Sequence, residues 1–133
     1  MNPESLLYAK THEWTAVSEA GGAKVATVGL TAFALKALTD LVFIDLPQVG
    51  RAVARGERFG EVESVKAVSD LYSPVDGEII EVNAGVADRL DRLADDPYVT
   101  GWLVKIRVSN PAGLADLMDY AAYQRQCEAE LQE

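Results

Sequence analysis

Most of the information about this chain lies in one stretch, Gly60-Glu61-Val62-Glu63-Ser64-Val65-Lys66-Ala67-Val68-Ser69-Asp70-Leu71-Tyr72-Ser73-Pro74. Apolar and polar residues alternate on both sides of Lys66, which predicts two half-buried strands, 59–64 and 68–73. A tight turn at residues 65–67 would place Lys66 at the tip of a hairpin. A lysine there is expected to be exposed and reachable by a modifying enzyme.

Acidic residues surround this lysine in the sequence. Glu61, Glu63 and Asp70 are expected to form an anionic collar around the tip. The pattern alone favours the simpler interpretation, which is an ordinary solvated lysine in a charged turn.

The rest of the chain also predicts short strands joined by turns, because Gly and Pro recur at short intervals through its middle. Residues 31–38 are the exception: Thr31 is a plausible N-cap, and the apolar residues after it follow helical spacing. Further strands are expected at residues 13–18, 24–28, 41–46, 78–83 and 102–108, the last with Trp102, Val104, Ile106 and Val108 on one face. The pattern predicts a mainly β chain of two antiparallel sheets packed face to face.

A single domain, residues 1–133, is expected from the chain length, with a C-terminal helical segment over about 111–133. Pro111 suits the start of a first short helix. In the last helix, apolar residues are expected to share one face: Tyr120, Tyr123, Cys127 and Leu131. The acidic segment 85–96 predicts loose helical structure.

Composition excludes several classes of function. The 133 residues carry a formal net charge of −9, which disfavours nucleic acid and anionic membrane surfaces and favours protein partners with basic rims. No apolar run is long enough for a membrane helix and no targeting segment is visible, so a cytoplasmic location is expected. The one cysteine, Cys127, can form no internal disulfide, and no catalytic triad order, phosphate-binding glycine loop or metal-ligand cluster is present.

The stretch Glu63–Asp70 is similar to the lipoylation motif of glycine cleavage H-proteins, E-S-V-K-A-x-S-D. The resemblance extends over residues 8–130. Its further pieces are His12-Glu13-Trp14, Val28-Gly29-Leu30-Thr31, Val42-Phe43-Ile44-Asp45-Leu46-Pro47, Ser73-Pro74-Val75, Asp96-Pro97-Tyr98 and Gly101-Trp102-Leu103-Val104-Lys105-Ile106. So many co-linear matches make a chance resemblance improbable.

This resemblance implies a fold and a cofactor. The fold would be a barrel-sandwich hybrid, related to lipoyl and biotinyl domains, and Lys66 would carry lipoic acid through an amide bond. Val65 and Ala67 stand where biotin carriers usually have methionines, so biotin is not expected. The implied site is Lys66 with its neighbours Glu63, Ser64, Val65, Ala67 and Asp70.

The implied role is that of a non-catalytic carrier, whose arm shuttles an aminomethyl group and reducing equivalents between enzymes of the glycine cleavage system. Its partners would be a lipoate ligase or lipoyl transferase, then glycine decarboxylase, aminomethyltransferase and dihydrolipoyl dehydrogenase. In the family the loaded arm folds back into a cleft of the carrier. Glu13 matches a position associated with that cleft, and its carboxylate or that of Asp70 could hold an ammonium group. An ordinary surface acid is the alternative for Glu13.

Two departures from the family pattern leave the cargo open. Thr39 stands where the family usually has glycine, and residues 88–95 lose a proline and gain two arginines near the expected cleft. An alternative role is therefore that of a lipoate-binding protein in sulfur oxidation, with a heterodisulfide-reductase-like complex as partner. A third possibility is an unmodified structural or binding module with an idle lysine.

Overall fold

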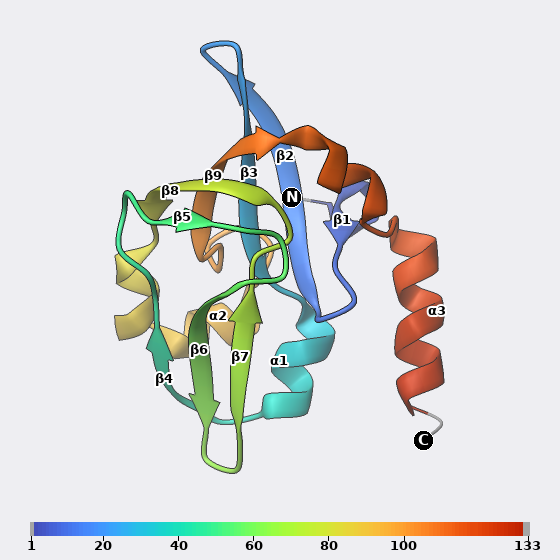
Figure 1. Cartoon of the computed structure of the whole chain (residues 1–133). Coiled ribbons are helices and arrows are strands. Elements are labelled where there is room, and N and C mark those ends of the chain that lie inside the picture. The colour runs from blue at the N-terminus through green and yellow to red at the C-terminus, as the bar shows by residue number, and fades with distance from the viewer. Residues whose placement is uncertain (1, 132–133) are drawn as a thin grey trace.

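Two antiparallel sheets form the body of the protein, in a computed structural model that describes residues 2–131 (Figure 1). The larger sheet has the strand order β1 (Leu7–Tyr8), β2 (Glu13–Ala20), β3 (Ala23–Leu30), β9 (Val104–Asn110), β8 (Asp76–Val82) and β5 (Ala52–Val53). The smaller sheet has the order β4 (Leu41–Asp45), β6 (Arg58–Ser64) and β7 (Val68–Tyr72). The predicted mainly β class with two antiparallel sheets is confirmed.

Helical elements connect and follow these strands. They are α1 (Ala32–Leu38), α2 (Leu90–Asp95) and α3 (Tyr120–Leu131), with 3₁₀ turns at Pro3–Ser5, Ala84–Asp88 and Pro111–Asp116. Residues 84–95 are thus helical in short pieces, as their loose pattern predicted. No helix in the described part of the chain is long and apolar enough to cross a bilayer.

Helix α1 begins at a favourable capping residue and ends at a residue with an unfavourable backbone conformation. The Thr31 hydroxyl accepts a hydrogen bond from the Ala34 amide at 3.2 Å, so the predicted N-cap is confirmed. At the other end Thr39 has φ 60° and ψ −144°, a backbone conformation that glycine adopts far more easily than threonine. The family's usual glycine is thus missing at a position whose geometry favours it.

The main core lies between the two sheets. It consists of buried aliphatic side chains and one phenylalanine, among them Val28, Val62, Leu71, Ile79, Leu103, Ile106 and Phe59. Burial of such side chains is the dominant stabilising term for a sandwich of this kind. This core holds β6 and β7 in place from their inner faces.

A second apolar cluster lies under α3, on the other face of the larger sheet. It consists of Leu6, Tyr8, Trp14, Tyr123 and Cys127. The Tyr8 and Tyr123 rings stack with centroids 4.4 Å apart, and the Trp14 indole donates to the Pro97 carbonyl at 3.0 Å. Cys127 is buried here as an apolar side chain of this cluster.

Two details of the predicted pattern were wrong. The strand predicted over residues 102–108 is β9, which begins only at Val104, so Trp102 packs against the second apolar cluster and does not share the face of Val104 and Ile106. Leu131 is 74% exposed, so it does not share the buried face of Tyr123 and Cys127. The final residues of the predicted C-terminal segment, 132 and 133, lie outside the described part of the chain.

Candidate functional site

Lys66 is exposed at the tip of the β6–β7 hairpin, as predicted (Figure 1). The turn is closed by Ser64, whose amide donates to the Ala67 carbonyl at 2.8 Å. The Ser64 hydroxyl also accepts from the Ala67 amide at 3.1 Å. Ser64 therefore has a structural role in the turn: it fixes the backbone on either side of Lys66. The Lys66 side chain itself stays exposed.

A second contact ties the tip to the rest of the molecule. The Val65 amide donates to the Asp40 carbonyl at 2.9 Å, just after the strained Thr39. The side chains of Val65 and Ala67 remain exposed. No ion pair joins Lys66 to any other residue within 2–131, so its amine is available for acylation.

The residues beside the tip are ordered by the strand register. Glu63 lies between Phe43 of β4 and Val68 of β7, and both of these apolar side chains are exposed. One step further from the tip, Glu61 lies between Asp45 and Asp70. An apolar row interrupted by one acid is thus followed by a row of three acids.

The predicted anionic collar is only partly correct, because Arg58 neutralises two of its three members. The Arg58 guanidinium lies 2.9 Å from an Asp70 carboxylate oxygen and 3.1 Å from one of Glu61. The two carboxylates hold the pKa of Arg58 above its usual range. Only Glu63 of the predicted collar has no ion pair among the described residues.

Glu13 is fully buried, so the alternative of an ordinary surface acid is wrong. It stands at the first position of β2, opposite Leu30. Its carboxyl accepts a hydrogen bond from the Thr11 hydroxyl and another, at 3.2 Å, from the Tyr72 amide at the end of β7. Glu13 therefore joins the larger sheet to the strand that follows the lysine turn.

Burial also changes the protonation of this carboxyl. Loss of hydration raises the pKa of Glu13 to about 7, and the bonds from Thr11 and Tyr72 oppose that rise only in part. Near neutral pH the group is present in both its neutral and its charged form. A carboxyl poised in this way can respond to a cation beside it.

Next to Glu13 lies a pocket of about 650 Å³, within the size range of small-ligand sites. Thr11 and Tyr72, the two partners of Glu13, both contribute to its wall. The other contributing residues are Tyr8, Ala9, Lys10, Arg55, Gly56, Ser73, Pro74, Asp116, Leu117 and Met118.

The altered segment 88–95 lies elsewhere. Leu90, Asp91 and Asp95 line a different pocket, of about 750 Å³, together with α1 and residues 39–41. None of its residues lines the pocket beside Glu13, so the predicted position near the arm's cleft is not seen at that pocket. The pocket that segment 88–95 lines does extend to the lysine turn, because Asp40 lines it and the Asp40 carbonyl accepts a hydrogen bond from the Val65 amide.

Sequence patterns missed three residues of this region: Arg58, Thr11 and Tyr72. Arg58 is twelve positions from Asp70, and the two meet only because β6 and β7 pair. Thr11 and Tyr72 have no motif of their own, and only their contacts with Glu13 single them out. Within residues 2–131 no group of three His, Cys, Asp or Glu side chains could hold a metal ion.

Comparisons with known proteins agree with this geometry. Residues 6–130 match the family model described as glycine cleavage H-protein. Proteins named glycine cleavage system H protein from Rhodopirellula baltica and Acaryochloris marina are 56% and 47% identical to this chain, over 127 and 126 residues and 95% of both chains in each case.

A solved structure supports the same assignment. The crystal structure of a glycine cleavage system H protein from Mycobacterium marinum is similar, with a TM-score of 0.83 and 40% identity. The match covers 94% of this chain and 98% of that one. The chain therefore belongs to the glycine cleavage H-protein family, the lipoyl carriers of the glycine cleavage system.

Proposed function

We propose that Lys66 is the residue to which lipoic acid is attached, and that the chain is a carrier without catalytic activity of its own. The observation that carries this proposal is the exposed lysine on a turn held by Ser64 and by Asp40. The fixed backbone of the turn reduces the conformational entropy that is lost when a modifying enzyme binds around the lysine. A lipoate ligase or lipoyl transferase is the partner for this step.

The attached lipoyl group would supply a disulfide that accepts a reduced one-carbon amine on sulfur and is restored by thiol–disulfide exchange. In this protein the exposed Lys66 lies at one end of β7 and the buried carboxyl of Glu13 lies at the other. From Val68 to Tyr72 the strand covers about 13 Å, at roughly 3.3 Å per residue. A lipoylated lysine side chain has a comparable extended length, on the order of 15 Å.

We therefore propose that Glu13 receives the cationic end of a loaded arm. An ammonium group beside a buried carboxyl favours its ionised form and gains a charge-assisted hydrogen bond. Because the pKa of Glu13 is about 7, this ionisation costs little near neutral pH. Asp70 is less suited, since Arg58 already occupies its carboxylate.

The enzymes proposed to exchange cargo with the arm are glycine decarboxylase, aminomethyltransferase and dihydrolipoyl dehydrogenase. Partner surfaces with basic rims would suit the net charge of −9. No observation in the described structure or among these relatives favours the sulfur-oxidation role with a heterodisulfide-reductase-like complex. The predicted cytoplasmic location stays a prediction.

The test is modification followed by reconstitution. The protein would be incubated with a lipoate ligase, lipoate and ATP, and analysed by intact mass and peptide mapping. One lipoyl adduct on Lys66 is expected, and the loaded protein should support glycine-dependent CO₂ exchange with a decarboxylase of the glycine cleavage system. An unmodified chain, or an adduct on another lysine, would refute the assignment of Lys66.

A further inference from the structure

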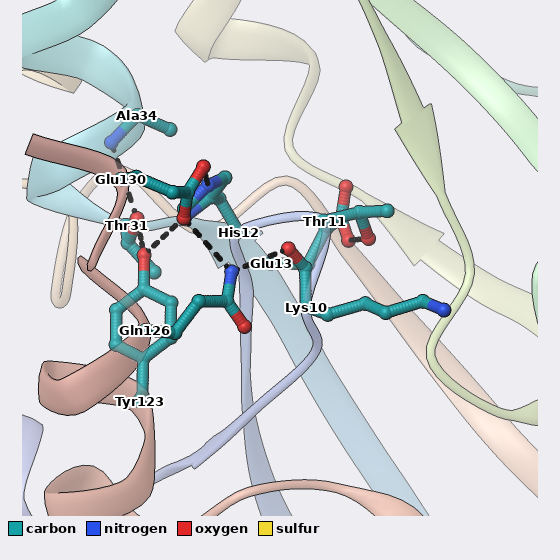
Figure 2. A network of polar contacts seen from close by, with 9 residues as sticks. All are labelled: Lys10, Thr11, His12, Glu13, Thr31, Ala34, Tyr123, Gln126 and Glu130. Atoms are coloured by element: carbon teal, nitrogen blue, oxygen red, sulfur yellow. Dashed lines mark hydrogen bonds and ion pairs between the residues drawn. The ribbon is translucent and has the colours of Figure 1, made fainter. Parts of the chain in front are cut away.

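Helix α3 makes long-range polar contacts with Lys10 and His12, in the segment 9–13 that leads into β2, and with Thr31 at the start of α1 (Figure 2). The Gln126 amide donates to the Lys10 carbonyl at 2.8 Å. The Tyr123 hydroxyl lies 2.6 Å from Nδ1 of His12, and a Glu130 carboxylate oxygen lies 3.1 Å from Nε2. Lys10 and His12 are more than 110 residues away in sequence from these partners on α3.

One arrangement of protons satisfies the whole network. Burial raises the pKa of the Tyr123 phenol, so its hydroxyl stays protonated and can donate to Nδ1 of His12. The Thr31 hydroxyl, 2.7 Å away, then donates to the Tyr123 oxygen. The other imidazole nitrogen donates to Glu130, whose pKa is lowered chiefly by the Gln126 amide and whose carboxylate is therefore charged. No two donors in this hydrogen-bond network compete for the same acceptor, which favours a single well-defined geometry.

The backbone of His12 needs such support. Its φ of 76° lies in the left-handed region, which costs a non-glycine residue about 1 kcal/mol or more and persists only where surrounding contacts hold it. The contacts on α3 act on its side chain, and the ring also stacks on Phe33 with centroids 5.0 Å apart. The Thr31 amide donates to its carbonyl at 3.1 Å.

The residues on either side of His12 are those that border the pocket. Thr11 lines it and bonds Glu13, and Glu13 accepts the Tyr72 amide across the sheets. The chain entering α3 lines the same pocket through Met118, which exchanges two backbone hydrogen bonds with Tyr8, at 2.8 and 2.7 Å. Thus α3 is bonded to the segment that carries Thr11, and the residues just before α3 line the pocket themselves.

We propose that α3 is a clamp on residues 9–13 and sets the position of Thr11 and Glu13 beside the pocket. His12, Tyr123 and Gln126 are then positioning residues that touch no cargo and act through this segment. That the pocket serves a loaded arm rests on the function proposed above, whereas the clamp itself can be measured on the unmodified protein.

The test is the double variant Tyr123→Phe, Gln126→Ala, in the full chain without lipoate. Tyr123→Phe keeps the ring that stacks on Tyr8 and removes only the hydroxyl; Gln126→Ala removes the bond to Lys10. The matched control is Gln124→Ala, the same change on the same helix at a side chain for which no hydrogen bond is found among the described residues.

The readout is the pKa of Glu13, followed by carboxyl ¹³C NMR during a pH titration. In the double variant the released segment should let water reach the carboxyl, so that its pKa falls by about one unit or more from about 7 toward the ordinary glutamate value. Exchange of the Tyr72 amide hydrogen should accelerate about tenfold. The control should leave both quantities at their wild-type values.

A folded double variant with an unchanged Glu13 pKa and unchanged Tyr72 exchange would overturn the clamp. If the double variant does not fold, the two single variants take its place, each with a smaller fall expected in the Glu13 pKa. A purely structural role for α3 would lower the melting temperature and leave that pKa where it is. None of these results depends on lipoylation, so a failure of Lys66 to accept lipoate would refute the carrier proposal separately.

Discussion

The two ends of β7 hold their key side chains in opposite ways. At one end Lys66 projects from a turn that is held by backbone hydrogen bonds, one of them to the Asp40 carbonyl, and by the Ser64 hydroxyl. At the other end Glu13 is fully buried and depends on Thr11, on the Tyr72 amide and, through His12, on helix α3. A modification site requires access, whereas a group that receives a cation gains from exclusion of water. The two requirements separate the site into an exposed part and a buried part.

The largest effect is expected at the exposed end. Lys66→Arg should abolish lipoylation completely, because the guanidinium is not acylated, and should change the free energy of unfolding by less than about 0.5 kcal/mol. Intact mass after ligase treatment and chemical denaturation measure the two quantities. Lys36→Arg, on the exposed face of α1, is the control and should be lipoylated as the wild type is. A stability loss of several kcal/mol would show that the tip is not as free as the contacts indicate.

The buried end should show its character in the pH dependence of stability. The pKa of Glu13 is raised from 4.5 to about 7, so its stabilising contribution is complete below pH 4.5 and is lost as the pH rises through about 7. Glu13→Gln removes this loss. The free energy of unfolding of the variant minus that of the wild type should rise by on the order of 3 kcal/mol between about pH 4 and pH 8. Parallel stability curves for the two proteins would contradict the burial of a titrating carboxyl.

A smaller gain is expected at Thr39, which precedes the carbonyl that holds the tip. Thr39→Gly should stabilise the protein by about 1 kcal/mol, because glycine adopts φ 60° without steric cost. Thr39→Ala is the matched control: both variants lose the hydroxyl bond to the Leu38 carbonyl, and only alanine keeps the Cβ. The difference in melting temperature between the Gly and the Ala variant therefore measures the cost of the backbone conformation alone. Equal melting temperatures for the two variants would argue against strain at this position.

The smallest effect is expected at Arg58. Its side chain is 47% exposed, and exposed ion pairs contribute little after screening by water and salt. Arg58→Gln should therefore leave the melting temperature nearly unchanged, in 0.02 M and in 0.5 M salt alike. A clear fall in the melting temperature at low salt that disappears at high salt would mean that the Glu61 and Asp70 carboxylates repel one another strongly without Arg58.

The exposed end could be predicted from the sequence to a large extent. Alternation in residues 59–64 and 68–73 placed the strands to within about one residue, and the position of Lys66 between them placed the turn. Thr31 was identified as the cap of α1 because capping depends on residues three positions apart. The neutralisation of the collar was not predictable, since Arg58 meets Asp70 only through strand pairing.

The sequence by itself determined what depends on near neighbours: the hairpin with its lysine, the cap of α1, and the motifs that mark the family. Only the tertiary structure decided that Glu13 is buried, that its pKa is raised, and that α3 reaches back over more than 110 residues to His12. The reason is physical. Strand and turn patterns reflect interactions along a few residues, whereas loss of hydration and the pairing of distant polar groups depend on which surfaces meet when the sheets and α3 pack together.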